Sequence, residues 1–397
     1  MTAETARQFE ALEAQAGRIM GVFTRAGHEA VAPAVIQPAG VFLDCIGEAL
    51  RARTYVFCDQ DGAELCLRPD LTVPTCRLHL ERFPDGGTTA KYCYNGPAFR
   101  YQPADATTAH PREFRQAGIE TFGGSAPIEE EAETLALMAD ALQAAGLDRT
   151  KLQLRFGDLE LVRALLDAVD MPPRWRQRLQ AQFWRPQAFR SELKRLTQDP
   201  SALAARFPPA LLTALSGATA SDAETILGSH LDAENCEPFG ARTLSEIAQN
   251  AVAVIEDSRA KPLTAATAAL IESYVAIRAA SPKAAEQIAA LAKASGIDLS
   301  APLASFKTRL SALKARGFNL DQATFSGDFG RSLEYYTGFV FEIAAPGLPQ
   351  VSPVAGGGRY DGLMAMAGCA RDVPAVGAAI HTERLLAVIE GGRHDRR

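Results

Sequence analysis

The stretch GDFGRSLEYYTGFVFE, residues 327–342, places charged side chains in what otherwise has the composition of a buried strand. Its second half is rich in aromatic and β-branched residues, which favour strands. Arg331 and Glu334 interrupt that run, and a charge within a buried strand is costly unless it has a partner. Two interpretations are open: a bound ligand pairs with these charges, or the segment is an edge strand with both side chains in water.

Around this stretch the chain has the composition of an ordinary globular protein. It has 397 residues, 47% of them hydrophobic, which suffices for two or three domains with a large core. Its seven cysteines include no C-x-x-C pair, which argues against a disulfide framework and a zinc site. We therefore expect reduced thiols, no metal and no cofactor.

Charge and the start of the chain argue against several classes of function. The first segment, MTAETARQFEALEAQAGRIM, has no apolar run long enough for a signal peptide or a membrane span. The net charge of -6 and the pI near 5.7 lack the basic footprint of general nucleic-acid binding. We expect a cytoplasmic protein that binds neither membrane nor nucleic acid.

One basic segment is an exception to this charge balance. Residues 174–195, RWRQRLQAQFWRPQAFRSELKR, hold seven basic residues, one acidic residue, Trp175 and Trp184. Basic residues interleaved with aromatics could contact RNA or an acidic partner surface. The alternative, which the acidic net charge favours, is a helix pair with buried tryptophans and a solvated basic face.

Periodicity predicts an α+β fold with a helical insertion. Apolar residues at helical spacing alternate with strand-like runs, and an Asp-Gly turn marks a hairpin. The predicted elements are a helix over 5–26, a hairpin over 53–67, an antiparallel pair at 91–101 and 112–122, and a helix over 128–147. Residues 161–317 are Ala/Leu-rich with few strand signals. We therefore predict a core of residues 1–160 and 318–397, with a helical insertion over 161–317.

Polar residues at strand ends and on one strand face are candidates for ligand contact. Asp70 and Thr72 follow a predicted strand, where they could hold a cationic amine or simply begin a helix. Gln116, Gly118 and Glu120 share one strand face, since side chains repeat every second residue. That face could hold a ligand, with the glycine leaving room for it, or could be solvated.

A glycine-rich turn, GGGRYDG at residues 356–362, is the last candidate. Its spacing matches neither a dinucleotide fingerprint nor a P-loop. Three consecutive glycines suit close approach of the backbone by a ligand or by another strand.

Together these segments resemble the catalytic domain of class II aminoacyl-tRNA synthetases of the histidyl type. VAPAVIQPAGVF, with Pro33, is similar to the dimer-forming first motif, GPAFRYQ…REFRQAGIE to the second, and GAAIHTERLL to the third. GRSLEYYTGFVFE and GGGRYDGL resemble the two histidine-specific motifs. The resemblance covers most of 1–160 and 318–390, and it implies an antiparallel sheet flanked by helices.

The resemblance also implies a histidine site. Carboxylates and polar groups would hold the ammonium, tyrosines would line the imidazole, and Arg331 would contact the carboxylate, which are the partners that a free histidine requires. The predicted histidine-binding residues are Asp70, Thr72, Arg100, Gln116, Glu120, Arg331, Tyr335, Tyr336 and Tyr360.

Several departures from the synthetase pattern bear on activity. The chain ends soon after Arg384, without the anticodon-binding domain expected there. Gln102 replaces the glutamate expected to recognise ATP, and the loop that follows has no Lys or Arg to neutralise tRNA phosphates. His381 and Thr382 replace two small residues of the third motif. Arg100, Arg331 and Arg384 are nevertheless retained at positions that contact ATP or the reacting carboxylate.

This combination resembles the regulatory subunits of ATP phosphoribosyltransferase, the first enzyme of histidine biosynthesis. The resemblance implies a subunit without catalytic activity that binds L-histidine and takes part in feedback inhibition. It also implies a homodimer through the first motif, and a hetero-octamer with a short catalytic subunit. Two other hypotheses stay open: a truncated class II enzyme that activates histidine or another amino acid with ATP, and a tRNA-dependent sensor that uses the basic segment.

Overall fold

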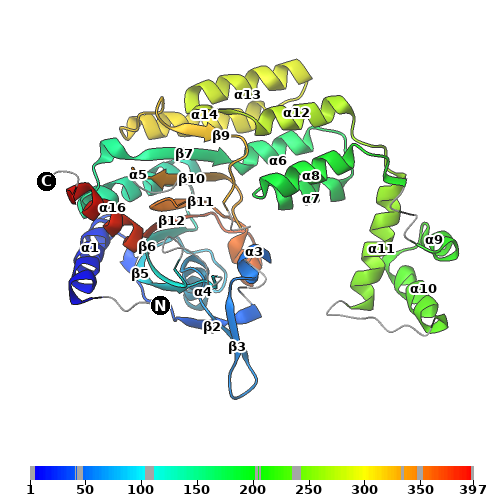
Figure 1. The fold of residues 1–397 in the computed structure, drawn as a ribbon, viewed down its shortest axis with the longest axis horizontal. Helices are drawn as coiled ribbons and strands as arrows, with labels where there is room; N and C mark the ends of the chain where they lie inside the picture. Colours follow the sequence, from blue (N-terminus) through cyan, green and yellow to red (C-terminus); the bar gives the residue numbers. More distant parts are fainter. Residues whose placement is uncertain are drawn as a thin grey trace. The chain divides into compact units, whose positions relative to one another are not determined.

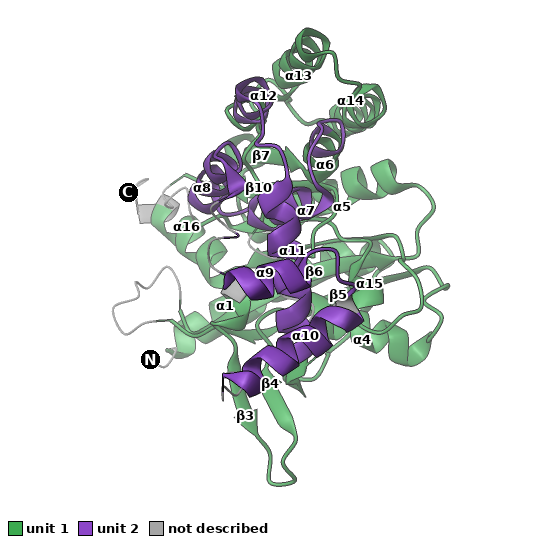
Figure 2. Cartoon of the chain, turned by 90° about the vertical axis from the view of Figure 1, so that its right-hand side faces the viewer, with its two compact units in different colours: residues 1–164, 274–397 green, residues 165–273 purple. Residues whose placement is uncertain are grey.

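The computed structural model divides into two compact units, residues 1–164 with 274–397 (unit 1) and residues 165–273 (unit 2) (Figure 2). The residues that it describes are 5–40, 42, 48–102, 111–201, 204, 207–234, 243–331, 335–346 and 352–394. Unit 2 lies within the predicted insertion, whereas residues 274–317 group with unit 1.

Unit 1 is built on a large sheet. In the described part of the chain, nine strands pair in the order β1-β5-β6-β12-β11-β10-β7-β9-β8. Neighbouring strands are antiparallel except in the β1–β5 and β7–β9 pairs. The strands are β1 (Glu29–Ala30), β5 (Ala90–Phe99), β6 (Glu113–Phe122), β7 (Gln153–Asp158), β8 (Arg278–Ala280), β9 (Thr324–Ser326), β10 (Phe339–Ala344), β11 (Ala355–Arg359) and β12 (Ala375–His381). The predicted antiparallel pair is β5 and β6, and the α+β class is confirmed.

Helices cover this sheet. The helix predicted over 5–26 is confirmed as α1 (Ala6–Arg25), which starts at a capping box formed by Thr5 and Gln8. It packs against α5 (Pro127–Ala145) and α16 (Thr382–His394) (Figure 1). The other helices of unit 1 include α3 (Glu48–Arg51), α4 (Thr72–Arg82), η1 (Arg149–Lys151), α13 (Ser281–Ser295), α14 (Ser300–Ala315) and α15 (Leu363–Met366).

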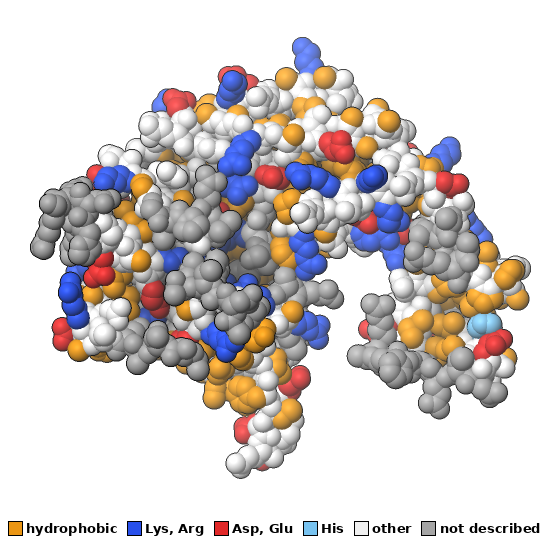
Figure 3. All heavy atoms as spheres, viewed as in Figure 1, with side chains coloured by type: hydrophobic (Ala, Val, Ile, Leu, Met, Phe, Trp, Pro, Cys, Tyr) orange, Lys and Arg blue, Asp and Glu red, His pale blue; other side chains and the backbone are white. Residues whose placement is uncertain are grey.

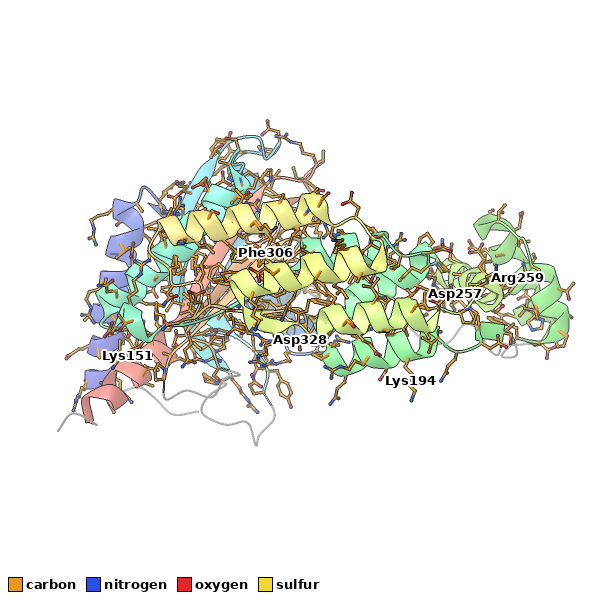
Figure 4. The ribbon with its side chains drawn as sticks, turned by 90° about the horizontal axis from the view of Figure 1, so that it is seen from above. Lys151, Lys194, Asp257, Arg259, Phe306 and Asp328 are labelled. Atoms are coloured by element: carbon orange, nitrogen blue, oxygen red, sulfur yellow. The ribbon has the colours of Figure 1, made fainter. Side chains whose placement is uncertain are left out.

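Helix α14 is tied to the sheet by packing and by buried charge. The ring of Phe306 packs against that of Phe325 on β9 at 5.1 Å between centroids (Figure 4). Arg309, only 3% exposed, donates to Glu131 of α5 at 2.5 Å and to Asp158 at the end of β7 at 2.7 Å. These buried ions stabilise the fold only as a complete set, because each is costly without its partners.

The hairpin predicted over 53–67 is confirmed as β3 (Tyr55–Cys58) and β4 (Glu64–Leu67). Gly62 has φ +82°, which a glycine adopts readily in the tight turn between them. β2 (Ile36–Pro38) joins the other side of β4 to complete a three-stranded sheet. Hydrophobic side chains show near the base of this hairpin in Figure 3.

The segment 327–342 enters the middle of the large sheet. Its strand, β10, begins only at Phe339 and pairs with both β7 and β11. The edge-strand interpretation is therefore wrong: the strand is central, and Arg331 lies in the segment before it. Glu334 lies outside the described residues.

The triple glycine lies in β11, between β10 and β12. A Cβ on Gly358 would lie 2.5 Å from the carbonyl oxygen of Phe339, and a Cβ on Gly357 would overlap the backbone of Gly377. Close approach by neighbouring strands, one of the two predicted uses, therefore accounts for Gly357 and Gly358, whereas a Cβ on Gly356 would overlap the guanidinium of Arg331.

Unit 2 is helical. Its elements are the end of α6 (Leu159–Asp167), α7 (Pro173–Gln182), α8 (Pro186–Leu196), α9 (Pro209–Leu215), α10 (Ala220–Ala233), α11 (Leu244–Arg259) and most of α12 (Ala265–Val275). Pro173, Pro186 and Pro209 each begin a helix, a position that tolerates proline because its N–H would be unpaired anyway.

The basic segment forms α7 and α8, and acidic residues of unit 2 pair with much of its charge. Arg174 and Arg178 lie 3.5 and 3.1 Å from the nearly buried carboxylate of Asp257 on α11, which is labelled in Figure 4. Arg178 also pairs with Glu192 at 2.9 Å, and Trp175 is fully buried. These contacts favour the interpretation as a packed helix pair over that as a nucleic-acid surface.

Two further features are absent from the described residues. None of the helices there combines the length and the apolarity that crossing a membrane requires. In the same residues, His, Cys, Asp and Glu side chains form no group of three or more that could hold a metal ion.

Candidate functional site

A buried carboxylate, Glu120 on β6, is the centre of a polar cluster inside unit 1. Its Oε1 accepts hydrogen bonds from Thr72 Oγ1 and from the Tyr94 hydroxyl, each at 2.8 Å. Its Oε2 accepts from the hydroxyl of Tyr360. Glu120 has no solvent exposure, so these hydroxyls take the place of water around the charge.

Two glycines make space for this arrangement. Gly377 on β12 pairs with Glu120, and a Cβ there would overlap the Glu120 carboxylate. Gly118 pairs with Tyr94, and a Cβ on it would lie 2.6 Å from the Tyr94 hydroxyl. The face of Gln116, Gly118 and Glu120 is buried, so the solvated alternative is wrong, and the space beside Gly118 holds the tyrosine.

Asp70 brings a second buried carboxylate to the cluster. It is 2% exposed, and it accepts hydrogen bonds from the Val73 backbone N–H at 3.2 Å and from the Tyr335 hydroxyl at 3.4 Å. The first contact stabilises the start of α4, so the predicted helix start and the predicted polar site coincide. Burial raises the pKa of Asp70, and the nearby positive charge of Arg100 opposes that rise.

Burial also raises the pKa of Glu120, to about 7. The hydroxyls of Tyr360, Thr72 and Tyr94 oppose this shift because they stabilise the ionised form, whereas the negative charge of Asp70 adds to it. A cation placed beside both carboxylates would relieve their desolvation, so the cluster is suited to an ammonium group.

Three tyrosine rings pack against one another beside the carboxylates. The ring centroids of Tyr335 and Tyr336 are 4.9 Å apart, and Tyr360 lies 5.5 and 6.1 Å from them. Such an aromatic group with hydroxyl tips suits a flat, polar heterocycle.

Arginines supply positive charge to the cluster, in contrast to the two carboxylates. Arg331 lies over the Tyr336 ring at 5.7 Å, and its Nη1 donates to the backbone oxygen of Phe341 at 3.2 Å. Its Nε is buried with no hydrogen-bond partner in the described residues. The pKa of Arg100 is lowered to about 10, chiefly by burial, and the charge of Arg331 contributes to that shift. Burial and the charge of Arg331 also lower the pKa of Arg384. This neighbourhood would favour an anion.

Seven of the nine predicted histidine-binding residues are linked to one another by hydrogen bonds, ring contacts or a cation–π contact. Arg100 is linked to this set by the electrostatic interaction of its guanidinium with the carboxylate of Asp70. Gln116 is buried on the Glu120 face, and its Oε1 has no hydrogen-bond partner in the described residues. The linked residues are Asp70, Thr72, Glu120, Arg331, Tyr335, Tyr336 and Tyr360.

Sequence reasoning missed Tyr94. Residues 92 and 94 alternate in KYCYNG and so share a strand face, which was the available signal. That Tyr94 reaches Glu120 depends on the β5–β6 register, which places it opposite Gly118.

The residues that depart from the synthetase pattern are well packed. Gln102 is 9% exposed, and its backbone oxygen accepts from Arg112 Nε at 3.0 Å. The ring of His381 packs against Phe114 at 5.2 Å. Thr382 is 1% exposed, and its backbone oxygen accepts from Gln15 at 3.1 Å. The predicted loop without Lys or Arg lies outside the described residues at 103–110.

Comparisons with known proteins identify relatives across nearly the whole chain. The family model described as histidyl-tRNA synthetase matches residues 4–233 and 240–385. The ATP phosphoribosyltransferase regulatory subunit of Brucella anthropi is 34% identical over 355 residues, which are 88% of this chain and 90% of that protein. The protein of the same name from Brucella ovis is 34% identical over 362 residues, 89% of this chain and 91% of the relative.

Solved structures share the fold. One described as an ATP phosphoribosyltransferase regulatory subunit/histidyl-tRNA synthetase from Bacillus halodurans has a TM-score of 0.68 at 19% identity, covering 98% of this chain and 81% of its own. Histidyl-tRNA synthetase from Nostoc has a TM-score of 0.60 at 15% identity, with 96% and 72% covered. The predicted class II synthetase-like fold is thereby confirmed.

Proposed function

The chain belongs to the family of ATP phosphoribosyltransferase regulatory subunits, within the wider histidyl-tRNA synthetase family, and on that premise we propose that it binds L-histidine at the Glu120 cluster. As a member of this family it is a regulatory subunit and not the catalyst, and it acts with a catalytic subunit. The observation that carries the proposal is the pair of buried carboxylates, Asp70 and Glu120. Arg331 adds positive charge; its Nη1 lies 3.8 Å from Glu342, and its Nε has no hydrogen-bond partner among the described residues.

The cluster offers a partner for each part of histidine. The ammonium would lie against Glu120 and Asp70 and donate to Gln116 Oε1, which has no hydrogen-bond partner in the described residues. The carboxylate would accept from Arg331, whose guanidinium has a fixed fork of donors. The imidazole would lie among the tyrosine hydroxyls. The contacts to Gln116 Oε1 and to Arg331 would satisfy buried atoms that have no hydrogen-bond partner among the described residues.

Regulation follows if histidine prefers one state of the assembly. A ligand shifts an equilibrium only by its difference in affinity between two states, typically ~1–3 kcal/mol in allosteric proteins. We propose that the partner is a short catalytic subunit, that the assembly is a cytoplasmic hetero-octamer, and that bound histidine inhibits the partner as feedback on histidine biosynthesis.

Calorimetric titration of the purified chain tests the binding proposal. L-histidine should bind, histidinol should bind more weakly because it offers Arg331 no carboxylate, and imidazolepropionate should not bind because it lacks the ammonium. Equal heats for histidine and imidazolepropionate would contradict a site built on Glu120 and Asp70.

The retained arginines support a second candidate, activation of an amino acid with ATP. Arg100, Arg331 and Arg384 lie near one another and would favour phosphate. Against it stand Gln102, His381 and Thr382, which depart from the synthetase pattern at positions that the resemblance assigns to the nucleotide site. We expect no amino-acid-dependent pyrophosphate exchange into ATP by the purified chain; exchange with histidine would establish the second candidate.

We also propose that two copies pair through the first motif and the sheet that it enters. Residues directly opposite each other on paired strands share a face of the sheet. In this three-stranded sheet one such set of opposite residues is apolar, and it forms one face. Ile36 is 52% exposed and Phe57 is 37% exposed. The apolar hairpin face consists of Ile36, Pro38, Tyr55, Phe57, Leu65 and Leu67.

Covering this face would explain its composition, since monomers rarely expose a contiguous apolar patch. We expect Phe57→Glu to reduce the mass in light scattering from a dimer to a single chain of 42.5 kDa. Gln60→Glu, with the same charge change at the exposed hairpin tip, should remain dimeric. A Phe57→Glu dimer as stable as the wild type would place the interface elsewhere.

A further inference from the structure

Tyr94 is a buried hydroxyl whose partner is the central carboxylate of the proposed site. It is 1% exposed, and its hydroxyl donates to Glu120 Oε1 at 2.8 Å. Its ring packs in a small apolar cluster with Leu71, Ala98 and Phe114. The ring therefore has little freedom, and the direction of its hydroxyl is set by packing.

Gly118 leaves the space through which the Tyr94 hydroxyl reaches Glu120. Tyr94 pairs with Gly118 across β5 and β6, and Glu120 follows two residues later on the same face. A Cβ at position 118 would lie 2.6 Å from the Tyr94 oxygen and 2.7 Å from its Cζ. A Cβ there would also lie 2.6 Å from the backbone oxygen of Ala378 on β12. Glycine at 118 is therefore required both by the β12 backbone and by Tyr94, and residues 94 and 118 form one device.

We infer that Tyr94, reaching across Gly118, is a positioning residue that holds Glu120 oriented and ionised for the ammonium of the ligand. This inference rests on the proposed histidine site. Tyr94 would act through Glu120 and is separate from the predicted histidine-binding residues. The device would make the site selective for ligands with a free amino group.

The effect of removing the Tyr94 hydroxyl depends on the other groups that face Glu120. Acidic and phenolic groups face Glu120 from four elements: Asp70 from the segment before α4, Tyr94 from β5, Tyr360 from the segment after β11, and Tyr335 and Tyr336 from the segment before β10.

Among these groups, the hydroxyls of Tyr94 and Tyr360, with that of Thr72, lower the pKa of Glu120, while Asp70 raises it. Burial and the Glu120 charge keep the pKa of Tyr94 well above 10, so the phenol stays a donor throughout the neutral range. Removing it should make Glu120 harder to ionise.

Histidine titrations of wild type and Tyr94→Phe between pH 5.5 and pH 9 test the inference. Wild-type affinity should rise with pH as Glu120 ionises. Loss of one hydrogen bond to a charged group should move the midpoint of that rise up by about one pH unit. At pH 6 the variant should then bind about 10-fold more weakly, and at pH 9 within about 3-fold of wild type.

Tyr92→Phe is the matched control, because Tyr92 lies on the same strand face but its hydroxyl contacts His79 Nδ1 at 3.2 Å. Its pH profile should match that of wild type. The imidazole of histidine titrates equally in all three experiments, so the difference between profiles isolates Glu120.

The possible results distinguish failure of the positioning role of Tyr94 from failure of the proposed histidine site. A Tyr94→Phe profile that coincides with wild type, or that drops equally at every pH, overturns the positioning role. No histidine binding by wild type at any pH overturns the proposed function and the inference with it. Thermal unfolding of each variant without ligand shows whether it is folded before titration.

Discussion

Glu120→Gln is expected to abolish detectable L-histidine binding while leaving the chain folded. The substitution keeps the size of the side chain and removes the charge that would pair with the ammonium. A buried charge pair that loses one member typically costs ~3–5 kcal/mol, since the remaining charge is left desolvated. That corresponds to a fall in affinity of at least about 100-fold at 25 °C.

The same variant should be more stable than wild type at alkaline pH. The folded-state pKa of Glu120 is raised to about 7 from an ordinary value of 4.5. Stability from a raised carboxyl pKa is fully present below the unfolded value and is lost as pH rises through the folded value. At pH 8 the wild type therefore bears a desolvation cost of about 3 kcal/mol that glutamine avoids.

Thermal unfolding without ligand at pH 8 and at pH 5 measures this difference. We expect Glu120→Gln to unfold at a higher temperature at pH 8, with the gap closing towards pH 5. Gln116→Ala serves as a binding control, because it removes a neutral contact and should weaken histidine less. A Glu120→Gln chain that unfolds at lower temperature than wild type at pH 8 would mean that the carboxylate stabilises the fold.

Arg309→Leu is expected to cost about 3–5 kcal/mol of folding free energy, the largest stability effect that we predict. Arg309 is 3% exposed and pairs with Glu131 at 2.5 Å and with Asp158 at 2.7 Å. Its loss leaves both carboxylates buried without this partner, although Glu131 keeps Arg359 at 2.5 Å. Arg359 precedes Tyr360, so the charge network also supports the site.

Arg316→Leu, at the C-cap of the same helix, is the matched control. Arg316 pairs with Glu129 of α5 at 2.7 Å, but the two side chains are 29% and 59% exposed. Such a pair contributes at most about 1 kcal/mol. Urea midpoints of the two variants should therefore differ clearly, and similar losses would contradict the assignment of a buried network.

The cost of Arg309→Leu should also depend on pH. Burial raises the pKa of Asp158 to about 6, and the charge of Arg309 opposes that rise. Without the arginine, protonation of Asp158 becomes easier, and a protonated carboxyl needs no cation. The variant should therefore lose less stability at pH 5 than at pH 8.

The sequence predicted the parts of the fold that depend on local pattern. Amphipathic spacing located α1, and the Asp61-Gly62 turn located the hairpin, because both are encoded within about twenty residues. The strand in 327–342 was recognised, but its place in the sheet was not, since pairing with β7 and β11 joins segments far apart in the chain.

The site was predicted by resemblance to a family and not by spacing. Asp70, Glu120 and Tyr360 come from three separated segments. Taken alone, the polar residues of these segments were also consistent with a helix start or with a solvated strand face. Arg309 and Glu131 are 178 residues apart, and no local pattern announces their pairing. Tyr94 was missed because its function depends on the β5–β6 register.

The central claim is that this chain makes a catalytic partner sensitive to histidine, and a reconstituted assay tests it most directly. ATP phosphoribosyltransferase activity of the short catalytic subunit from the same organism would be measured alone, with this chain, and with the Glu120→Gln variant, over a range of L-histidine. We predict that both chains raise activity and that histidine then inhibits only the wild-type assembly. Activity that ignores the added chain, or equal inhibition with Glu120→Gln, would contradict the account.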